Sequence, residues 1–178
     1  MAHKEQFQYV ESVKTNFRNF FLNKTVLEFG SLNINGSVRN FFENCCYIGL
    51  DLGPGPDVDV IGLAHEYDLP DQSFDVVLST EMFEHDPHWK ESFTNMIRLC
   101  KKEGLIFFTC ASTGRKEHGT IHSDIQSSPL TVKLGWDYYR NLTETDFRKE
   151  FDFPMLFSNY EFTENKFSHD LYFWGIKQ

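Results

Sequence analysis

The chain has 178 residues, a size typical of one domain, and its 19 Phe residues indicate an aromatic core. The chain has 17 Lys and Arg but 26 Asp and Glu residues, so its net charge is −9. Because basic side chains supply most of the affinity for nucleic acids, we expect no nucleic-acid partner. No apolar run approaches the roughly 18 residues of a membrane helix, and residues 1–14 carry no apolar signal segment, so we expect no membrane span and a cytoplasmic protein.

In chain order, the first half alternates helical and strand patterns, as expected for one unit spanning 1–178. The apolar spacing over 5–22, within an N-terminal segment 1–23, predicts an amphipathic helix. Strands are predicted at 25–29, 47–50, 58–61 and 74–78, and a helix around 38–42.

The second half opens with a predicted helix that starts at Asp86-Pro87, with Asp86 as N-cap, and runs to Gly104. A strand over 105–110 follows. Residues 111–141 are polar and weakly periodic, and a loop of this length is usually functional. Thr143 then caps a short helix, and strands are predicted at 155–162 and 171–176.

Alternating strands and helices predict an α/β fold, a mostly parallel sheet with helices on both faces. The connection between the last two strands is too short for a crossover helix, so this pair is predicted to be antiparallel.

Four cysteines, Cys45, Cys46, Cys100 and Cys110, form no C-x-x-C pair, and we expect reduced core thiols. His118, His122 and Asp124 have spacing that also suits a metal, but they lie in the long loop without a fixed scaffold. We therefore expect no metal site.

Two residues point to a ligand at the ends of the first two strands. Gly30 directly follows the first strand, where a glycine lets the backbone approach a ligand closely. Asp51 ends the second strand, where an acidic side chain can accept both hydroxyls of a ribose. The pair indicates an adenosine-containing ligand, although each residue is also common in an ordinary turn.

The loop after Gly30 differs from a dinucleotide-binding loop. It continues Ser-Leu-Asn-Ile-Asn-Gly, so the next glycine is Gly36 and G-x-G-x-x-G is missing. Glu28 would repel a pyrophosphate but suits an ammonium group. Both features favour S-adenosylmethionine (SAM) over a nicotinamide cofactor.

Three stretches, VLEFGSLNINGSVRNFF, YIGLDLGPGPDVDVIGLAHEYDLPDQSFDVVLSTEMFEHDPHW and MIRLCKKEGLIFFTCAS, resemble the class I SAM-dependent methyltransferases. The resemblance covers about residues 24–112, in the family's order and spacing. The later DYYRNLTETDF is similar to a subset of small methyltransferases, some of them encoded near glycan-biosynthesis functions.

The resemblance implies a Rossmann-like seven-stranded sheet in the order 3-2-1-4-5-7-6, with strand 7 antiparallel. It places Glu28, Gly30 and Ser31 against the methionine part of SAM. It places Asp51 at the ribose and Leu52 on the adenine. It also places Ala64 and His65 in contact with the edge of the adenine, and Ser79, Thr80 and Glu81 beside the sulfonium.

Two positions depart from the family pattern. The family usually has G-x-G-x-G after the first strand, whereas this chain has Gly30, Asn33, Asn35 and Gly36. Leu63 stands where an Asp often accepts the adenine amino group, so a backbone carbonyl or Asp68 has to do so.

An oxygen acceptor for a methyl group also needs a base, and His is the usual choice. His85 is the first candidate, although it can equally orient the loop before Pro87. His118 and His122 are further candidates or solvated loop residues; they lie in the loop 111–141, which resembles the family's acceptor-side insertion. Tyr138, Tyr139 and Arg140 form an acceptor wall with His118, or simply pack the loop on the core.

We therefore predict a SAM-dependent methyltransferase whose acceptor is a small polar molecule, with a sugar or glycan intermediate as a candidate. A non-catalytic SAM-binding regulatory or partner protein is the alternative, motivated by the altered glycine pattern. A nicotinamide-binding protein is a third and weaker reading.

Overall fold

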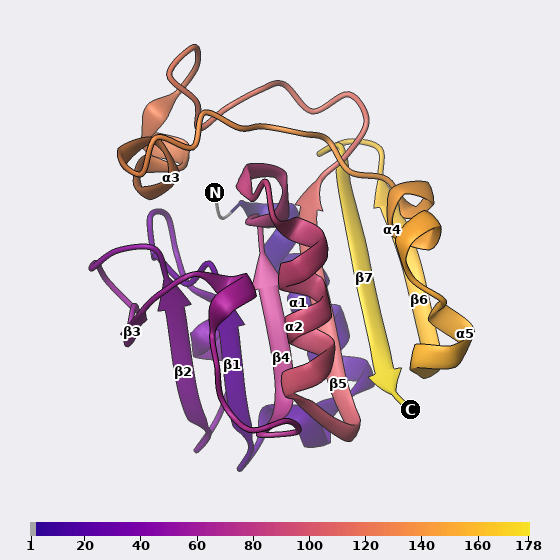
Figure 1. The fold of residues 1–178 in the computed structure, drawn as a ribbon. Coiled ribbons are helices and arrows are strands. Elements are labelled where there is room, and N and C mark those ends of the chain that lie inside the picture. The colour runs from indigo at the N-terminus through magenta and orange to yellow at the C-terminus, as the bar shows by residue number, and fades with distance from the viewer. Residues whose placement is uncertain (1–2) are drawn as a thin grey trace.

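The computed structural model describes residues 3–178. Its sheet has seven strands in the order β3-β2-β1-β4-β5-β7-β6, so the predicted fold class and strand order are confirmed (Figure 1). The strands are β1 (Thr25–Phe29), β2 (Cys46–Asp51), β3 (Val60–Ile61), β4 (Phe74–Thr80), β5 (Cys100–Ala111), β6 (Phe157–Asn165) and β7 (Asp170–Lys177).

The pairing of the strands follows the length of their connections. The pairs β1–β2, β1–β4, β2–β3 and β4–β5 are parallel, whereas β7 runs antiparallel to β5 and β6. Only residues 166–169 join β6 to β7. A connection this short closes a hairpin and cannot hold a crossover, which confirms the predicted antiparallel pair.

The helices cover both faces of the sheet. They are α1 (Lys4–Asn16), α2 (Trp89–Leu99), α3 (Pro129–Lys133), α4 (Glu144–Glu150) and α5 (Phe153–Leu156). Figure 1 shows α2 in front of the sheet and α1 behind it, while α3 lies above the carboxyl ends of β1 and β2. Single 3-10 turns occur at Arg18–Phe21, Val38–Phe41, Ala64–Glu66, Phe83–His85 and Ile125–Ser127.

Successive side chains of the central strands point to opposite faces of the sheet. In β5, Ile106 and Phe108 belong to the core beneath α2, while Leu105 and Phe107 belong to the core beneath α1. The predicted aromatic core lies mainly on the α2 side. There Phe93 of α2 is fully buried and packs against Phe rings of α4, α5, β5 and β7.

Two predicted helices are shorter in the structure. The N-terminal helix ends at Asn16 and gives way to the 3-10 turn Arg18–Phe21. The predicted helix around 38–42 is only the turn Val38–Phe41, because Phe42 is extended and stacks on Phe21 with ring centroids 4.4 Å apart. The loop after Gly30 therefore leads into a single 3-10 turn and not into a long helix whose N-terminal amides could bind a ligand.

The predicted boundaries of the next helix were wrong. Its N-cap is His88, and Asp86 lies in a preceding turn, where its carboxylate accepts from the His88 amide at 2.8 Å. The helix ends at Leu99, and Gly104 lies inside β5. A Cβ at Gly104 would stand 2.9 Å from the Asp75 carbonyl oxygen, so glycine here serves strand packing.

The C-terminal elements follow the prediction more closely. Thr143 and Asp146 form a capping box at the start of α4, as predicted. Residues 155 and 156 belong to α5 rather than to the strand, because the Asp152 side chain caps a helical turn there. All four cysteines are free, but only Cys100 and Cys110 are buried, so the expectation of a core thiol was wrong for the exposed Cys46.

No helix within residues 3–178 is both long enough and apolar enough to cross a membrane.

Phe93→Ala should remove the centre of the aromatic core. We expect a loss of about 3–5 kcal/mol in the free energy of unfolding, measured by urea denaturation. Phe167→Ala is the matched control, because Phe167 is 97% exposed, and it should change stability by less than about 0.5 kcal/mol. Equal losses in the two variants would contradict this description of the core.

Candidate functional site

A cavity lies at the carboxyl ends of β1, β2 and β4. The chain order of the strands reverses between β1 and β4, and open α/β sheets bind ligands at such a point. Most of the predicted site residues line it, namely Glu28, Gly30, Ser31, Asp51, Leu52, Ala64, His65, Thr80, Glu81 and His85.

Asp51 is held in place by two backbone amides. Its Oδ2 accepts from the Leu32 amide and its Oδ1 from the Leu52 amide, at 2.8 and 2.7 Å. Burial raises the pKa of Asp51 above its ordinary value, and these two hydrogen bonds oppose the rise. Each carboxylate oxygen retains acceptor capacity for a ligand hydroxyl.

Gly30 turns the chain at the end of β1. Its φ of +78° is a left-handed conformation, and an added Cβ would stand 2.8 Å from the Met82 Cβ. The amides of Gly30 and Ser31 both donate to the Leu50 carbonyl oxygen. The position therefore requires glycine, both for its backbone angle and for its close approach to Met82.

Asparagine hydrogen bonds brace the loop that lacks the usual glycine pattern. The Asn33 side chain accepts from the Gly36 amide at 2.7 Å and donates to Asp57 at 2.8 Å. The Asn33 amide also donates to the Pro56 carbonyl oxygen. These bonds tie the loop after β1 to the loop after β2, so a rigid cavity wall forms without further glycines.

Glu28 is fully buried at the base of the cavity. Its carboxylate accepts from the hydroxyls of Tyr47 and Thr80, at 2.8 and 3.3 Å. Burial raises the pKa of Glu28 to about 7, although both hydrogen bonds lower it. The side chain can thus hold a proton, or bear a negative charge toward a cationic group, near neutral pH.

Aromatic side chains surround the predicted adenine position. The ring centroids of His65 and His88 are 4.2 Å apart, and Trp136 lies 5.6 Å from His88. Helix α2 fixes this segment, because the Asn95 side chain donates to the carbonyl oxygens of Ala64 and Tyr67. The result is an aromatic wall of three rings, in which His88 is tilted by 31° from His65 and by 57° from Trp136.

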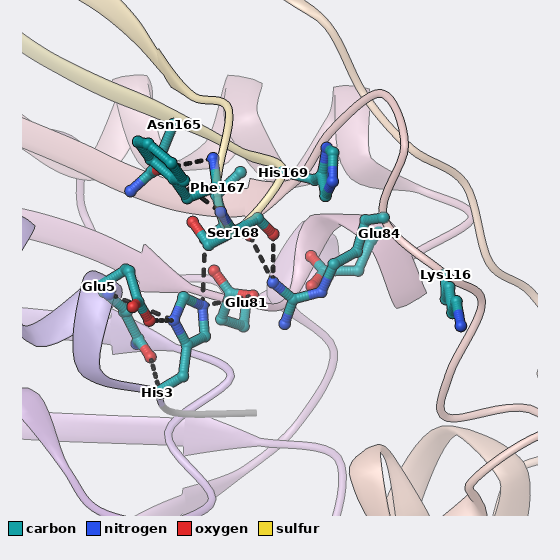
Figure 2. Close-up of polar contacts among 12 residues, drawn as sticks. His3, Glu5, Glu81, Glu84, Lys116, Asn165, Phe167, Ser168 and His169 are labelled. Atoms are coloured by element: carbon teal, nitrogen blue, oxygen red, sulfur yellow. Dashed lines mark hydrogen bonds and ion pairs between the residues drawn. The ribbon is translucent and has the colours of Figure 1, made fainter.

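Glu81 takes part in a buried ion-pair network with the N-terminus of α1 (Figure 2). His3 Nε2 lies 3.6 Å from a Glu81 oxygen and 3.2 Å from an Asp170 oxygen, and Arg115 pairs with Asp170 at 3.0 Å. Burial lowers the pKa of His3, but Asp170 and Glu81 raise it more strongly, to about 10. Glu81 itself has a φ of +55°, a strained backbone angle at the cavity edge.

A second buried group lies beside His85, on the side where the sequence places the acceptor. The His118 ring centroid is 4.9 Å from that of His85, and the Tyr139 ring lies 4.9 Å from His118 and 5.5 Å from His85. The neighbouring Glu84 is completely buried. The loop 111–141 therefore brings two predicted acceptor residues, His118 and Tyr139, to His85.

The remaining predicted site residues lie elsewhere. Ser79 is buried inside β4 and does not line the cavity. His122 is 75% exposed at its side chain and pairs with Asp137 at 3.4 Å. Tyr138 is only half-buried, and Arg140 forms an ion pair with Asp146. None of the roles predicted for these residues is tested by their placement.

Sequence reasoning missed several lining residues that come from distant segments. Gln6 of α1, Met82 and residues 127–131 all line the cavity. The only available signal for Gln6 was the capping box that it forms with His3, which reveals a helix start but no site.

Glu28→Gln should change how stability depends on pH. The folded-state pKa of about 7 lies above the ordinary 4.5, so the folded chain holds an extra proton between these values. Wild-type stability therefore falls as the pH rises through this window, and the variant lacks that fall. We expect the free energy of unfolding of the variant, relative to wild type, to rise from about pH 5 to about pH 8 by up to about 3 kcal/mol.

Glu103→Gln, at an exposed position of β5, is the control and should keep the wild-type pH profile. A difference between Glu28→Gln and wild type that stays constant with pH would show that Glu28 does not titrate in this window.

The comparisons with known proteins agree with this geometry. Residues 47–108 match the methyltransferase domain family. No curated protein matches the chain significantly. Among solved structures, a Burkholderia thailandensis 1,6-didemethyltoxoflavin-N1-methyltransferase with bound S-adenosylhomocysteine has a TM-score of 0.65 at 14% identity, covering 97% of this chain and 78% of that one.

Two further structures show the same likeness. Haemonchus contortus phosphoethanolamine N-methyltransferase 2, in complex with S-adenosylhomocysteine, has a TM-score of 0.66 at 15% identity, with coverage of 96% and 52%. YcgJ from Bacillus subtilis has a TM-score of 0.63 at 13% identity, with coverage of 96% and 99%. The expected glycan-biosynthesis subset gains no support from these matches. The chain thus has the fold of the class I SAM-dependent methyltransferases, and its residues 47–108 match their methyltransferase domain family.

Proposed function

We propose that the protein is a SAM-dependent methyltransferase for a small polar acceptor. The observation that carries this proposal is the Asp51 carboxylate, which two amides hold at the cavity with acceptor capacity to spare. Similar folds have been crystallised with SAM or S-adenosylhomocysteine, which supports the same cofactor here.

The cavity offers a matching group for each part of SAM. Asp51 accepts the two ribose hydroxyls, and the adenine lies against Leu52, Ala64 and His65. Glu28 supplies negative potential for the methionine ammonium, because its carboxylate is buried in a low-dielectric site where charges interact strongly. The same carboxylate disfavours the pyrophosphate of a nicotinamide cofactor.

Methyl transfer requires alignment more than covalent chemistry by the protein. A lone pair of the acceptor attacks the methyl carbon, the carbon–sulfur bond breaks, and its electron pair returns to sulfur to give the neutral thioether. Holding acceptor and methyl in line can supply most of the barrier reduction. Thr80 and Glu81, at the end of β4, flank the space in which the sulfonium would lie.

The acceptor binds on the side of His85, where the loop 111–141 closes over the cavity. A Cβ at Gly119 would stand 2.7 Å from both His85 and Ser128, so Gly119 and Ser128 lie close to His85 here. Leu130, close to Gly53, and Trp136, close to His65, line the adenine end of the cavity instead. His85 remains the candidate base, because both of its ring nitrogens lack a hydrogen-bond partner among the described residues. This wall suits small polar molecules in general and does not single out a sugar or glycan intermediate.

Asp51→Asn should weaken the binding of S-adenosylhomocysteine. Hydrogen bonds to a charged group contribute about 1.5–3 kcal/mol each, so loss of the charge should raise Kd at least about tenfold, as measured by isothermal titration calorimetry. Asp71→Asn is the control, because Asp71 is exposed, pairs with Arg98 and lies outside the cavity. A wild-type chain that does not bind the ligand would refute the proposal.

Turnover separates the enzyme from the non-catalytic alternative. The enzyme should release S-adenosylhomocysteine from SAM when supplied with a fractionated pool of small polar metabolites. Tight binding without turnover on any fraction would instead support a SAM-binding regulatory or partner protein.

A further inference from the structure

Three metal-ligating side chains converge beside the cavity. Glu84 and His85 lie on the 3-10 turn Phe83–His85 after β4, and His118 lies in the loop after β5. One potential ligand atom from each residue lies within 4.8 Å of the other two. The distance from Glu84 Oε1 to His85 Nε2 is 4.0 Å.

Glu84 and His85 are buried, His118 is half-buried, and the atoms that they could offer to a metal ion lack hydrogen-bond partners among the described residues. Both Glu84 oxygens, both His85 ring nitrogens and His118 Nε2 have no hydrogen-bond partner among the described residues. Glu84 is 0% exposed and His85 is 2% exposed. An unpaired buried carboxylate is strongly unfavourable, and buried charges in proteins are paired or coordinate metals. A cation bound between these side chains would therefore give their unpartnered oxygen and nitrogen atoms a partner.

The other candidate groups among the described residues already hold a cationic side chain or are dispersed. His3, Glu81 and Asp170 also converge, but the His3 cation and Arg115 pair with the two carboxylates there (Figure 2). The combination weighed from the sequence, His118 with His122 and Asp124, does not assemble. Asp124 instead caps the turn Ile125–Ser127, and His122 faces solvent.

We propose that Glu84, His85 and His118 bind one divalent first-row transition-metal ion, such as Zn²⁺. Two imidazoles and one carboxylate are a donor set that these ions prefer. This departs from the sequence-based expectation of no metal, which considered only ligands within the long loop.

The surroundings of His118 match a metal ligand. His118 Nδ1 lies 3.0 Å from the Lys116 carbonyl oxygen, a pure acceptor, so Nδ1 carries the proton and donates. This tautomer leaves the lone pair on Nε2, the unpartnered nitrogen. A ligating histidine typically fixes its ring by donating its other N–H in this way.

The required rearrangement is small. Ligand atoms at about 2.0–2.1 Å from a tetrahedral ion lie about 3.3 Å apart, so these side chains have to close in by about 1 Å. Three protein ligands leave at least one coordination position for water or a substrate oxygen. His85 lines the cavity, and Tyr139 has an unpartnered hydroxyl nearby, so that position is accessible to a molecule in the cavity.

The ion also suggests that the methyl acceptor is a hydroxyl group, an inference that rests on the proposed methyltransferase function. A bound divalent ion lowers the pKa of a coordinated oxygen group and orients it. An acceptor hydroxyl held there would lose its proton to solvent before its oxygen attacks the methyl group. His85 would then act as a ligand rather than as the base.

Co²⁺ and Zn²⁺ binding to the full chain, stripped of metal with a chelator, tests the site. We expect one equivalent by calorimetry and a Co²⁺ absorption spectrum typical of nitrogen and oxygen ligands. His118→Ala and Glu84→Gln should each raise the metal Kd at least about 100-fold, because even loss of a partner behind a ligand costs 10–100-fold. His122→Ala, in the same loop, should bind like wild type.

Several outcomes would overturn the site. These are no saturable binding, equal affinity in His118→Ala and His122→Ala, loss of binding in His3→Ala alone, or a thiolate charge-transfer band, which would place the ion on a cysteine such as Cys45 or Cys46. Circular dichroism confirms that each variant is folded.

Binding of S-adenosylhomocysteine to the same variants separates the two proposals. His118→Ala should keep the wild-type Kd for this ligand. Loss of metal binding with cofactor binding intact would defeat only the metal site, whereas metal binding without cofactor binding would defeat only the methyltransferase.

Discussion

Two amide hydrogen bonds to the Asp51 carboxylate hold the binding face together. They come from Leu32, in the loop after β1, and from Leu52, in the loop after β2. The Leu50 carbonyl oxygen also accepts from the amides of Gly30 and Ser31. The two loops therefore form one rigid unit, whose shared carboxylate faces the cavity. Every other group of the site is placed relative to this unit, because β4 packs against β1 in parallel register.

Much of this face was predictable, because its residues lie at or directly after the ends of strands that are mostly apolar. Such strands are recognised from a short run of residues, and their carboxyl ends meet at one edge of a parallel sheet. Gly30, Asp51 and Thr80 each mark the end of such a run. The antiparallel last pair was predictable for a similar reason, since the length of a connection limits the direction of the next strand.

The rest of the site depends on contacts between distant segments, which no local pattern contains. Gln6 reaches the cavity because His3 pairs with Glu81, in the middle of the chain, and with Asp170, near its other end. The loop 111–141 is only weakly periodic, so its sequence did not predict that His118 lies against His85 while His122 is exposed. The missing glycines were likewise compensated by Asn33, whose partner Asp57 belongs to another loop.

Three buried carboxylates near the cavity show how this protein treats charge in its interior. Glu28 accepts hydrogen bonds from two hydroxyls, and Glu81 lies beside a protonated histidine. Glu84 has neither kind of partner among residues 3–178. Burial and the nearby Glu81 raise the pKa of Glu84, so a neutral carboxyl is the form favoured without a cation. Burying the Glu84 carboxyl without a partner lowers the stability of the fold, and an ion bound there would remove this penalty. Functional sites commonly reduce the stability of the fold in this way in order to bind a ligand.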